Sequence, residues 1–91
     1  MAERQVKVAT DVGLHARPAA VFVQTAAVSE NEVGLTKDGR RVNAKSILAV
    51  LGLDVRNGEE ITIDSDDETV VNRLAGLVTD TGETGAPRNP R

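Results

Sequence analysis

Polar and apolar residues alternate in several short stretches of this chain, which is the pattern of half-buried β-strands. Residues 5–9, 32–36 and 60–64 show this alternation. Residues 38–39 are Asp-Gly, a strong signal for a two-residue hairpin, so residues 40–43 are expected to form the returning strand. The apolar residues that share one face of the second and last of these strands are Val33, Leu35, Ile61 and Ile63.

The periodicity changes to that of an amphipathic helix from Ala16 onward. Pro18 suits the first turn of such a helix, because first-turn amides have no intrahelical acceptor to lose. A turn over residues 11–14 would separate this helix from the first strand. The apolar face expected for the helix consists of Ala19, Ala20, Val23, Ala26 and Ala27.

Two further helices carry capping signals. Ser46 precedes a short apolar stretch and can cap a helix that ends near Gly52. Residues 65–68 are Ser-Asp-Asp-Glu, which matches a capping box with the serine as N-cap. The apolar face expected for the last helix consists of Val70, Val71, Leu74, Leu77 and Val78.

The predicted order of elements is therefore β-α-β-β-α-β-α. Because each helix has one apolar face and the strands alternate, the helices should pack on one face of an open sheet, giving an α+β fold. A chain of 91 residues has room for one domain, which we place at residues 1–80. Residues 81–91 are rich in glycine and proline and have little to bury, so we predict a disordered tail there.

Composition excludes several classes of protein. The net charge is −3, which argues against a nucleic-acid binder, and the single aromatic residue, Phe22, offers no base-stacking platform. With no cysteine and one histidine, the chain has no disulfide, no thiolate metal ligand and no paired-histidine zinc site. Neither a P-loop nor a Gly-x-Gly-x-x-Gly motif is present, so we expect no cofactor.

The N-terminal residues are polar and are not followed by an apolar targeting segment. The longest fairly apolar run, residues 19–23, is too short to cross a bilayer. We therefore expect a cytoplasmic protein without membrane insertion.

The most informative segment is residues 13–20, Gly-Leu-His-Ala-Arg-Pro-Ala-Ala. His15 lies between a glycine turn and the expected helix start, where free backbone N–H groups favour an anion. Arg17 adds a permanent positive charge that suits a phosphate or a carboxylate. A neutral imidazole nitrogen can accept a phosphoryl group directly, and the helix end and Arg17 would then stabilise the adduct.

The same residues can also be neutral, because a histidine near a helix start with an arginine two residues later occurs by chance in many proteins. No arrangement of a hydrolytic triad is suggested, and one histidine with scattered carboxylates makes no metal site. A functional His15 therefore suits a transient group carrier better than a self-sufficient enzyme.

Residues 13–19, together with Lys-Ser-Ile-Leu at 45–48, resemble the HPr family, the histidine-containing phosphocarriers of the bacterial phosphoenolpyruvate:sugar phosphotransferase system. The resemblance covers residues 3–80. It implies an open-faced β-sandwich, with a four-stranded antiparallel sheet and three helices on one face. It also implies that His15 accepts a phosphoryl group at Nδ1 from phosphorylated enzyme I and passes it to the IIA domain of a sugar permease. Arg17 matches the family's phosphoryl-stabilising arginine, and Ala16 and Arg17 would supply backbone amides.

Ser46 and the apolar residues that follow it have two interpretations. Ser46 can be an ordinary N-cap, yet the stretch is more apolar than a one-sided short helix needs, which suggests an exposed docking surface. The resemblance implies that Ile47, Leu48 and Leu51 contact enzyme I and the IIA domains. In low-GC Gram-positive relatives an HPr kinase/phosphorylase phosphorylates the matching serine. The segment here departs from the methionine-rich family pattern, which leaves this regulation of Ser46 open.

Positive charges at Arg40, Arg41 and Lys45 would lie near this surface if the hairpin runs alongside it. The simplest interpretation is solvated surface charge. The alternative is steering toward acidic partner surfaces.

Two other functions stay open. A regulatory module of the same fold would act through phosphorylation of Ser46, although relatives of that kind lack the histidine. A paralogous carrier in a nitrogen or dihydroxyacetone relay would use the same chemistry with other partners. We expect a monomer, because a carrier presents one face to two partners in turn.

Overall fold

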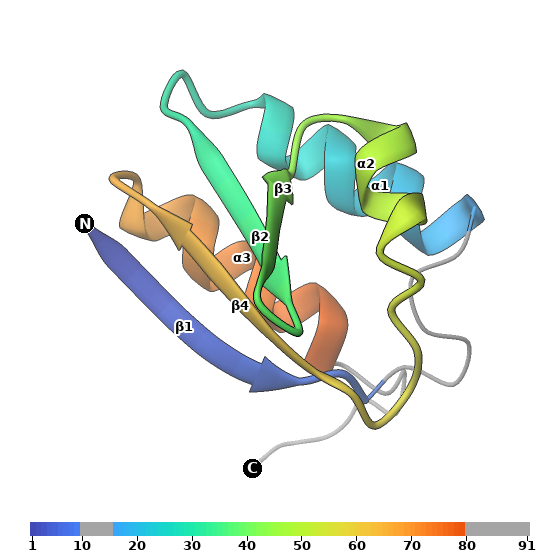
Figure 1. The fold of residues 1–91 in the computed structure, drawn as a ribbon. Helices are drawn as coiled ribbons and strands as arrows, with labels where there is room; N and C mark the ends of the chain where they lie inside the picture. Colours follow the sequence, from blue (N-terminus) through green and yellow to red (C-terminus); the bar gives the residue numbers. More distant parts are fainter. Residues whose placement is uncertain (10–15, 80–91) are drawn as a thin grey trace, which may run out of the picture.

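The computed structural model describes residues 1–9 and 16–79, with the side chains of residues 16–18 excepted. Within these residues the elements follow the predicted order. Figure 1 shows the strands in one sheet with the helices on one side of it. The elements are β1 (Ala2–Lys7), α1 (Ala16–Ala27), β2 (Val33–Lys37), β3 (Arg40–Asn43), α2 (Ile47–Gly52), β4 (Glu60–Ser65) and α3 (Glu68–Thr79).

The sheet has four strands in the order β1-β4-β2-β3, and all neighbouring pairs are antiparallel. Strand β4, the last in the sequence, therefore lies between β1 and β2 (Figure 1). The α+β class and the open-faced arrangement with helices on one face are confirmed. The strand order depends on pairing between distant segments, which the local pattern does not encode.

The core lies between the sheet and the helices. The inward residues of β2 and β4 are the predicted ones, and their side chains are at most 1% exposed: Val33, Leu35, Ile61 and Ile63. The buried face of α1 differs from the predicted one, because Phe22 is fully buried while Ala27 is exposed. On α3, Leu77 was expected inside but is 38% exposed, and Ala75 is buried.

The first strand begins earlier than the alternation predicts. Strand β1 spans Ala2–Lys7, and Val8 and Ala9 lie beyond it. The Val8 N–H donates to the Glu59 carbonyl at 2.8 Å, and the Ala9 N–H donates to the Val78 carbonyl at 2.8 Å. Pairing with β4 from Ala2 onward overrides the polar character of the N-terminal residues.

The capping box predicted for the last helix is wrong. Ser65 is the final residue of β4 and is 1% exposed, and its hydroxyl accepts from the Asp67 N–H at 3.1 Å. Asp67 is the N-cap instead, because its carboxylate accepts from the Val70 N–H at 3.2 Å. The helix begins at Glu68, so this glutamate lies in the first turn directly after the cap rather than three residues from it.

The turn signals are local, and the structure agrees with them. Asp38 and Gly39 have φ values of 53° and 81° and join β2 to β3, as a tight hairpin turn requires.

In the described part of the chain no helix is long and apolar enough to cross a bilayer. The tail predicted at 81–91 lies outside the described residues.

Candidate functional site

Helix α1 begins at Ala16, the residue that directly follows His15 in the sequence. The first N–H groups of a helix have no partner within it, and the helix dipole favours an anion at this end. The first turn of α1 contains no acidic residue that would compete for this position. His15 lies outside the described residues, and Arg17 is described only as the second residue of the helix.

The position of this helix end depends on the burial of the rest of α1. Ala19, Phe22 and Ala26 recur at helical spacing and are fully buried, so they fix the helix against the core. The helix stops at Ala27, and the Ser29 N–H donates to the Ala26 carbonyl at 3.1 Å just beyond it.

Ser46 is the N-cap of α2. It has extended backbone angles, with φ −106° and ψ 114°, and its hydroxyl accepts from the Ala49 N–H at 3.3 Å. The Ser46 carbonyl accepts from the Val50 N–H at 3.0 Å. The capping interpretation is therefore confirmed, and phosphorylation of Ser46 stays a prediction.

The apolar residues of α2 divide between core and solvent. Val50 is fully buried, and Leu51 is partly buried against the core. Leu48 is 79% exposed and Ile47 is 36% exposed. The expectation that some of these side chains face solvent is confirmed, and α2 lies beside α1 (Figure 1). We call Ile47, Leu48 and Leu51 the docking surface, after the role that the resemblance predicts for them, and that role stays a prediction.

The three predicted positive charges do not form one surface patch. Val42 packs against the core, so its neighbour Arg41 points to the open face of the sheet, away from the helices. There Arg41 binds Asp64 with its Nη2 2.8 Å from Oδ1. Lys45 Nζ donates to the Ser29 carbonyl at 2.6 Å, and Arg40 is exposed. Arg41 is therefore excluded from a basic patch beside α2.

Comparison with protein families decides what kind of chain this is. Residues 2–80 match the family model described as "PTS HPr component phosphorylation site". The chain belongs to the HPr family. It is 51% identical over 82 residues to "Phosphocarrier protein HPr" of Streptomyces coelicolor, with 86% of this chain and 88% of the relative covered.

Solved structures of the family have the same fold. The HPr structure from Bacillus anthracis is 40% identical and has a TM-score of 0.82, covering 85% of this chain and 95% of that one. A crystal structure of Crh from Bacillus subtilis is 42% identical with a TM-score of 0.66, covering 86% and 93%. Crh is a catabolite repression protein, and its crystal structure is a domain-swapped dimer. The family thus contains phosphocarriers and HPr-like relatives.

A hydrogen-bonded pair that sequence reasoning missed connects α1 to α3 in this HPr-family chain. The Ser29 hydroxyl donates to the Asp67 carboxylate at 2.8 Å and accepts from the Asn31 N–H at 3.1 Å. The Ser29 hydroxyl, followed by the Val70 N–H, lowers the pKa of Asp67 below its usual value. The pair fixes the C-terminal end of α1 to the start of α3, so it supports the helix layer that carries the site.

Proposed function

We propose that this protein is a phosphocarrier of the phosphotransferase system and that His15 is its phosphoryl acceptor. Phosphorylated enzyme I, itself charged by phosphoenolpyruvate, transfers the group to His15 Nδ1, and His15 passes it to the IIA domain of a sugar permease. The observation that carries this proposal is the start of α1 at Ala16, directly after His15, in a chain whose family match covers residues 2–80.

The chemistry needs few residues. A neutral imidazole nitrogen attacks phosphorus, and the bond from phosphorus to enzyme I breaks as the bond to Nδ1 forms. The backbone amides of Ala16 and Arg17 and the Arg17 guanidinium stabilise the charge of the phosphoryl group. Attack by the IIA domain on phosphorus then restores free His15. The protein is thus an intermediate between two partners and not an enzyme with a substrate of its own.

The docking surface is proposed to contact both partners. Leu48 carries most of its exposed apolar area, and Ile47 lies beside it on α2. Such side chains bind by excluding water at the centre of an interface. A phosphate on Ser46, the cap of this same helix, would place charge next to that surface and disfavour association, which is the regulatory role proposed for a kinase.

The decisive experiment is phosphorylation with enzyme I, phosphoenolpyruvate and Mg²⁺, followed by intact mass spectrometry. We expect the added mass of one phosphoryl group, labile in acid and absent from a His15→Ala variant. The enzyme I used should charge the Streptomyces coelicolor relative under the same conditions, as a positive control. If that relative is charged and this protein is not, the carrier function is wrong.

The similarity to Crh favours one second candidate, a regulatory module acting through Ser46. In that case the protein would take phosphate on Ser46 from a kinase and ATP, while enzyme I would leave it unmodified.

The same similarity bears on the expected monomer, because Crh forms a swapped dimer. Light scattering during size-exclusion chromatography gives the mass of this chain in solution, and a mass of twice 9.6 kDa would contradict the monomer.

A further inference from the structure

Helix α2 carries the docking surface but is poorly stabilised by its own hydrogen bonds. It has six residues, and isolated helices of that length do not form in water. Its fully buried residue is Val50, so core packing alone gives it one strong anchor. The orientation of Leu48 therefore depends on what binds the two ends of the helix.

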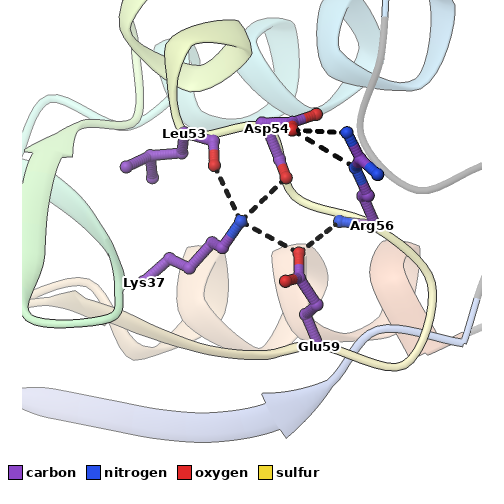
Figure 2. Close-up of polar contacts among 5 residues, drawn as sticks. All are labelled: Lys37, Leu53, Asp54, Arg56 and Glu59. Carbon is purple, nitrogen blue, oxygen red and sulfur yellow. Dashed lines mark hydrogen bonds and ion pairs between the residues drawn. The ribbon is translucent and has the colours of Figure 1, made fainter.

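At the C-terminal end the anchor is Lys37, the last residue of β2 (Figure 2). Its Nζ donates to the Leu53 carbonyl at 2.9 Å and to the Asp54 carbonyl at 2.8 Å, and lies 2.9 Å from Glu59 Oε1. An ammonium group has three protons, and these three oxygens can accept all of them. The Lys37 side chain is 13% exposed and its bond to the Leu53 carbonyl is partly buried, whereas the Asp54 carbonyl and Glu59 lie nearer the surface.

The loop that follows α2 is folded around this ammonium group. Glu59 Oε1 also accepts from the Arg56 N–H at 2.8 Å, and the Arg56 Nη2 lies 2.9 Å from Asp54 Oδ2 (Figure 2). Asp54 has a left-handed φ of 53°, a conformation that costs energy for a residue other than glycine. Lys37, followed by the Arg56 N–H, lowers the pKa of Glu59, in keeping with a carboxylate that stays charged here.

At the N-terminal end a second lysine makes the equivalent bond. Lys45, the residue before the Ser46 cap, donates from Nζ to the Ser29 carbonyl just beyond α1. Lys37 comes instead from the hairpin on the sheet, so α2 is attached to α1 at one end and to the sheet at the other. A lysine bound to carbonyls at a helix C-terminus also has the charge that the helix dipole favours.

We propose that Lys37 is a positioning residue for the docking surface. By binding the Leu53 and Asp54 carbonyls it fixes the direction of α2, so that Leu48 and Ile47 are presented in one orientation to a partner protein. The docking part of this proposal rests on the proposed function. Lys37 acts through α2, so its loss should weaken recognition of the partner and leave the chemistry at His15 intact.

The test uses three variants of the full chain. Lys37→Met keeps an unbranched apolar side chain that ends where the ammonium group begins, so the two carbonyls lose their donor, whereas Lys37→Arg keeps a cation with several donors. Lys7→Met is the matched control, because Lys7 lies on β1 at the sheet edge opposite β3, is exposed, and makes no polar side-chain contact among the residues the structure describes.

Amide hydrogen exchange measures whether Lys37 stabilises α2. We expect the α2 amides to exchange roughly tenfold faster in Lys37→Met, with α3 amides unchanged and Lys37→Arg close to wild type. Unchanged α3 amides show that the variant is folded. Wild-type exchange rates at α2 would overturn the proposal. If Lys37→Met does not fold, Lys37→Gln replaces it in both measurements, since its amide can still donate to one carbonyl.

Kinetics with enzyme I then separate docking from chemistry. We expect the KM for this protein as the phosphoryl acceptor to rise roughly fivefold in Lys37→Met, with kcat nearly unchanged, and no change in Lys7→Met. An unchanged KM, or a loss confined to kcat, would overturn the proposal. If enzyme I fails to charge the wild-type chain, the proposed function is wrong, and hydrogen exchange alone decides whether Lys37 positions α2.

Discussion

The Arg41 guanidinium binds the Asp64 carboxylate through two bonds on the open face of the sheet, Nη2 to Oδ1 at 2.8 Å and Nε to Oδ2 at 3.2 Å. Arg41 of β3 pairs with Thr36 of β2, whereas Asp64 of β4 pairs with Gly34 of β2, so the Arg41 side chain runs diagonally over Gly34 to reach Asp64. One side chain therefore spans three strands. The hydrogen bonds that Arg41 donates to Asp64 raise the pKa of Arg41, and the Asp64 side chain is 12% exposed.

Loss of this pair should destabilise the protein measurably. Arg41→Met leaves a carboxylate that is nearly buried without its donor, which should lower the free energy of unfolding by about 1–3 kcal/mol. Urea unfolding at neutral pH gives this value. Arg56→Met is the control, because both side chains of the Arg56–Asp54 pair are exposed to solvent. Its free energy of unfolding should fall by much less than that of Arg41→Met. Equal losses in the two variants would show that burial of Asp64 is irrelevant.

Gly34 should be required only because Arg41 lies over it. A Cβ at Gly34 would collide with the Arg41 guanidinium, so the guanidinium would have to shift from the position in which it binds Asp64. Gly34→Ala should therefore destabilise the wild type by about 1–2 kcal/mol. In an Arg41→Ala background the collision is gone, and alanine should be neutral or stabilising because it is a better strand residue than glycine. A double-mutant cycle that shows simple additivity would contradict this argument.

The Ser29–Asp67 pair should make stability depend on pH. The pKa of Asp67 is lowered in the folded protein, so its contribution is present above the unfolded value, about 3.9, and is lost as the pH falls through the native pKa. Ser29→Ala removes the hydrogen bond that contributes most to the lowered pKa of Asp67, so it should raise that pKa. The difference in unfolding free energy from wild type should be greatest at neutral pH and shrink below about pH 4.

NMR titration of the Asp67 carboxyl and urea unfolding at several pH values check this prediction. An Asp67→Asn background is the control, because Ser29→Ala should then produce no pH-dependent difference. A Ser29→Ala effect with the same size at every pH in both backgrounds would assign the loss to packing alone.

Features with a local cause were predicted correctly from the sequence. The Asp38-Gly39 turn, the Ser46 cap and the inward Val33 and Leu35 each depend on a few neighbouring residues. The last helix shows the limit of local signals, because a serine and an aspartate both fit the cap, and burial of Ser65 at the end of β4 leaves the cap to Asp67.

Features that depend on distant segments could not be predicted. The strand order requires β4 to insert beside β1 and β2, and Lys37 meets the Leu53 carbonyl 16 residues away. In the sequence Lys37 is only a surface charge next to a turn. The same distinction applies to the candidate site. The start of α1 after His15 and the exposure of Leu48 could be predicted from the local sequence pattern. The contacts that orient α2 could not.

Two variants at Ser46 separate its capping role from a charge switch. Ser46→Ala removes the acceptor for the Ala49 N–H and should lower the free energy of unfolding by about 1 kcal/mol. Ser46→Asp keeps a good N-cap, so its stability should stay near that of wild type. If charge at this position regulates docking, Ser46→Asp should slow phosphoryl transfer from enzyme I without any loss of stability. Transfer at the wild-type rate would remove the switch and leave Ser46 as a cap.

The exposure of Leu48 makes its replacement a test of docking without a stability cost. Leu48 is 79% exposed, so Leu48→Ser should change the free energy of unfolding by no more than about 0.5 kcal/mol. Loss of a central apolar contact should nevertheless raise the KM for transfer from enzyme I roughly tenfold, which corresponds to about 1.4 kcal/mol. The control is Leu77→Ser, an exposed leucine on α3, for which the KM should not change. Equal effects of the two substitutions on the KM would mean that α2 is not the surface enzyme I recognises.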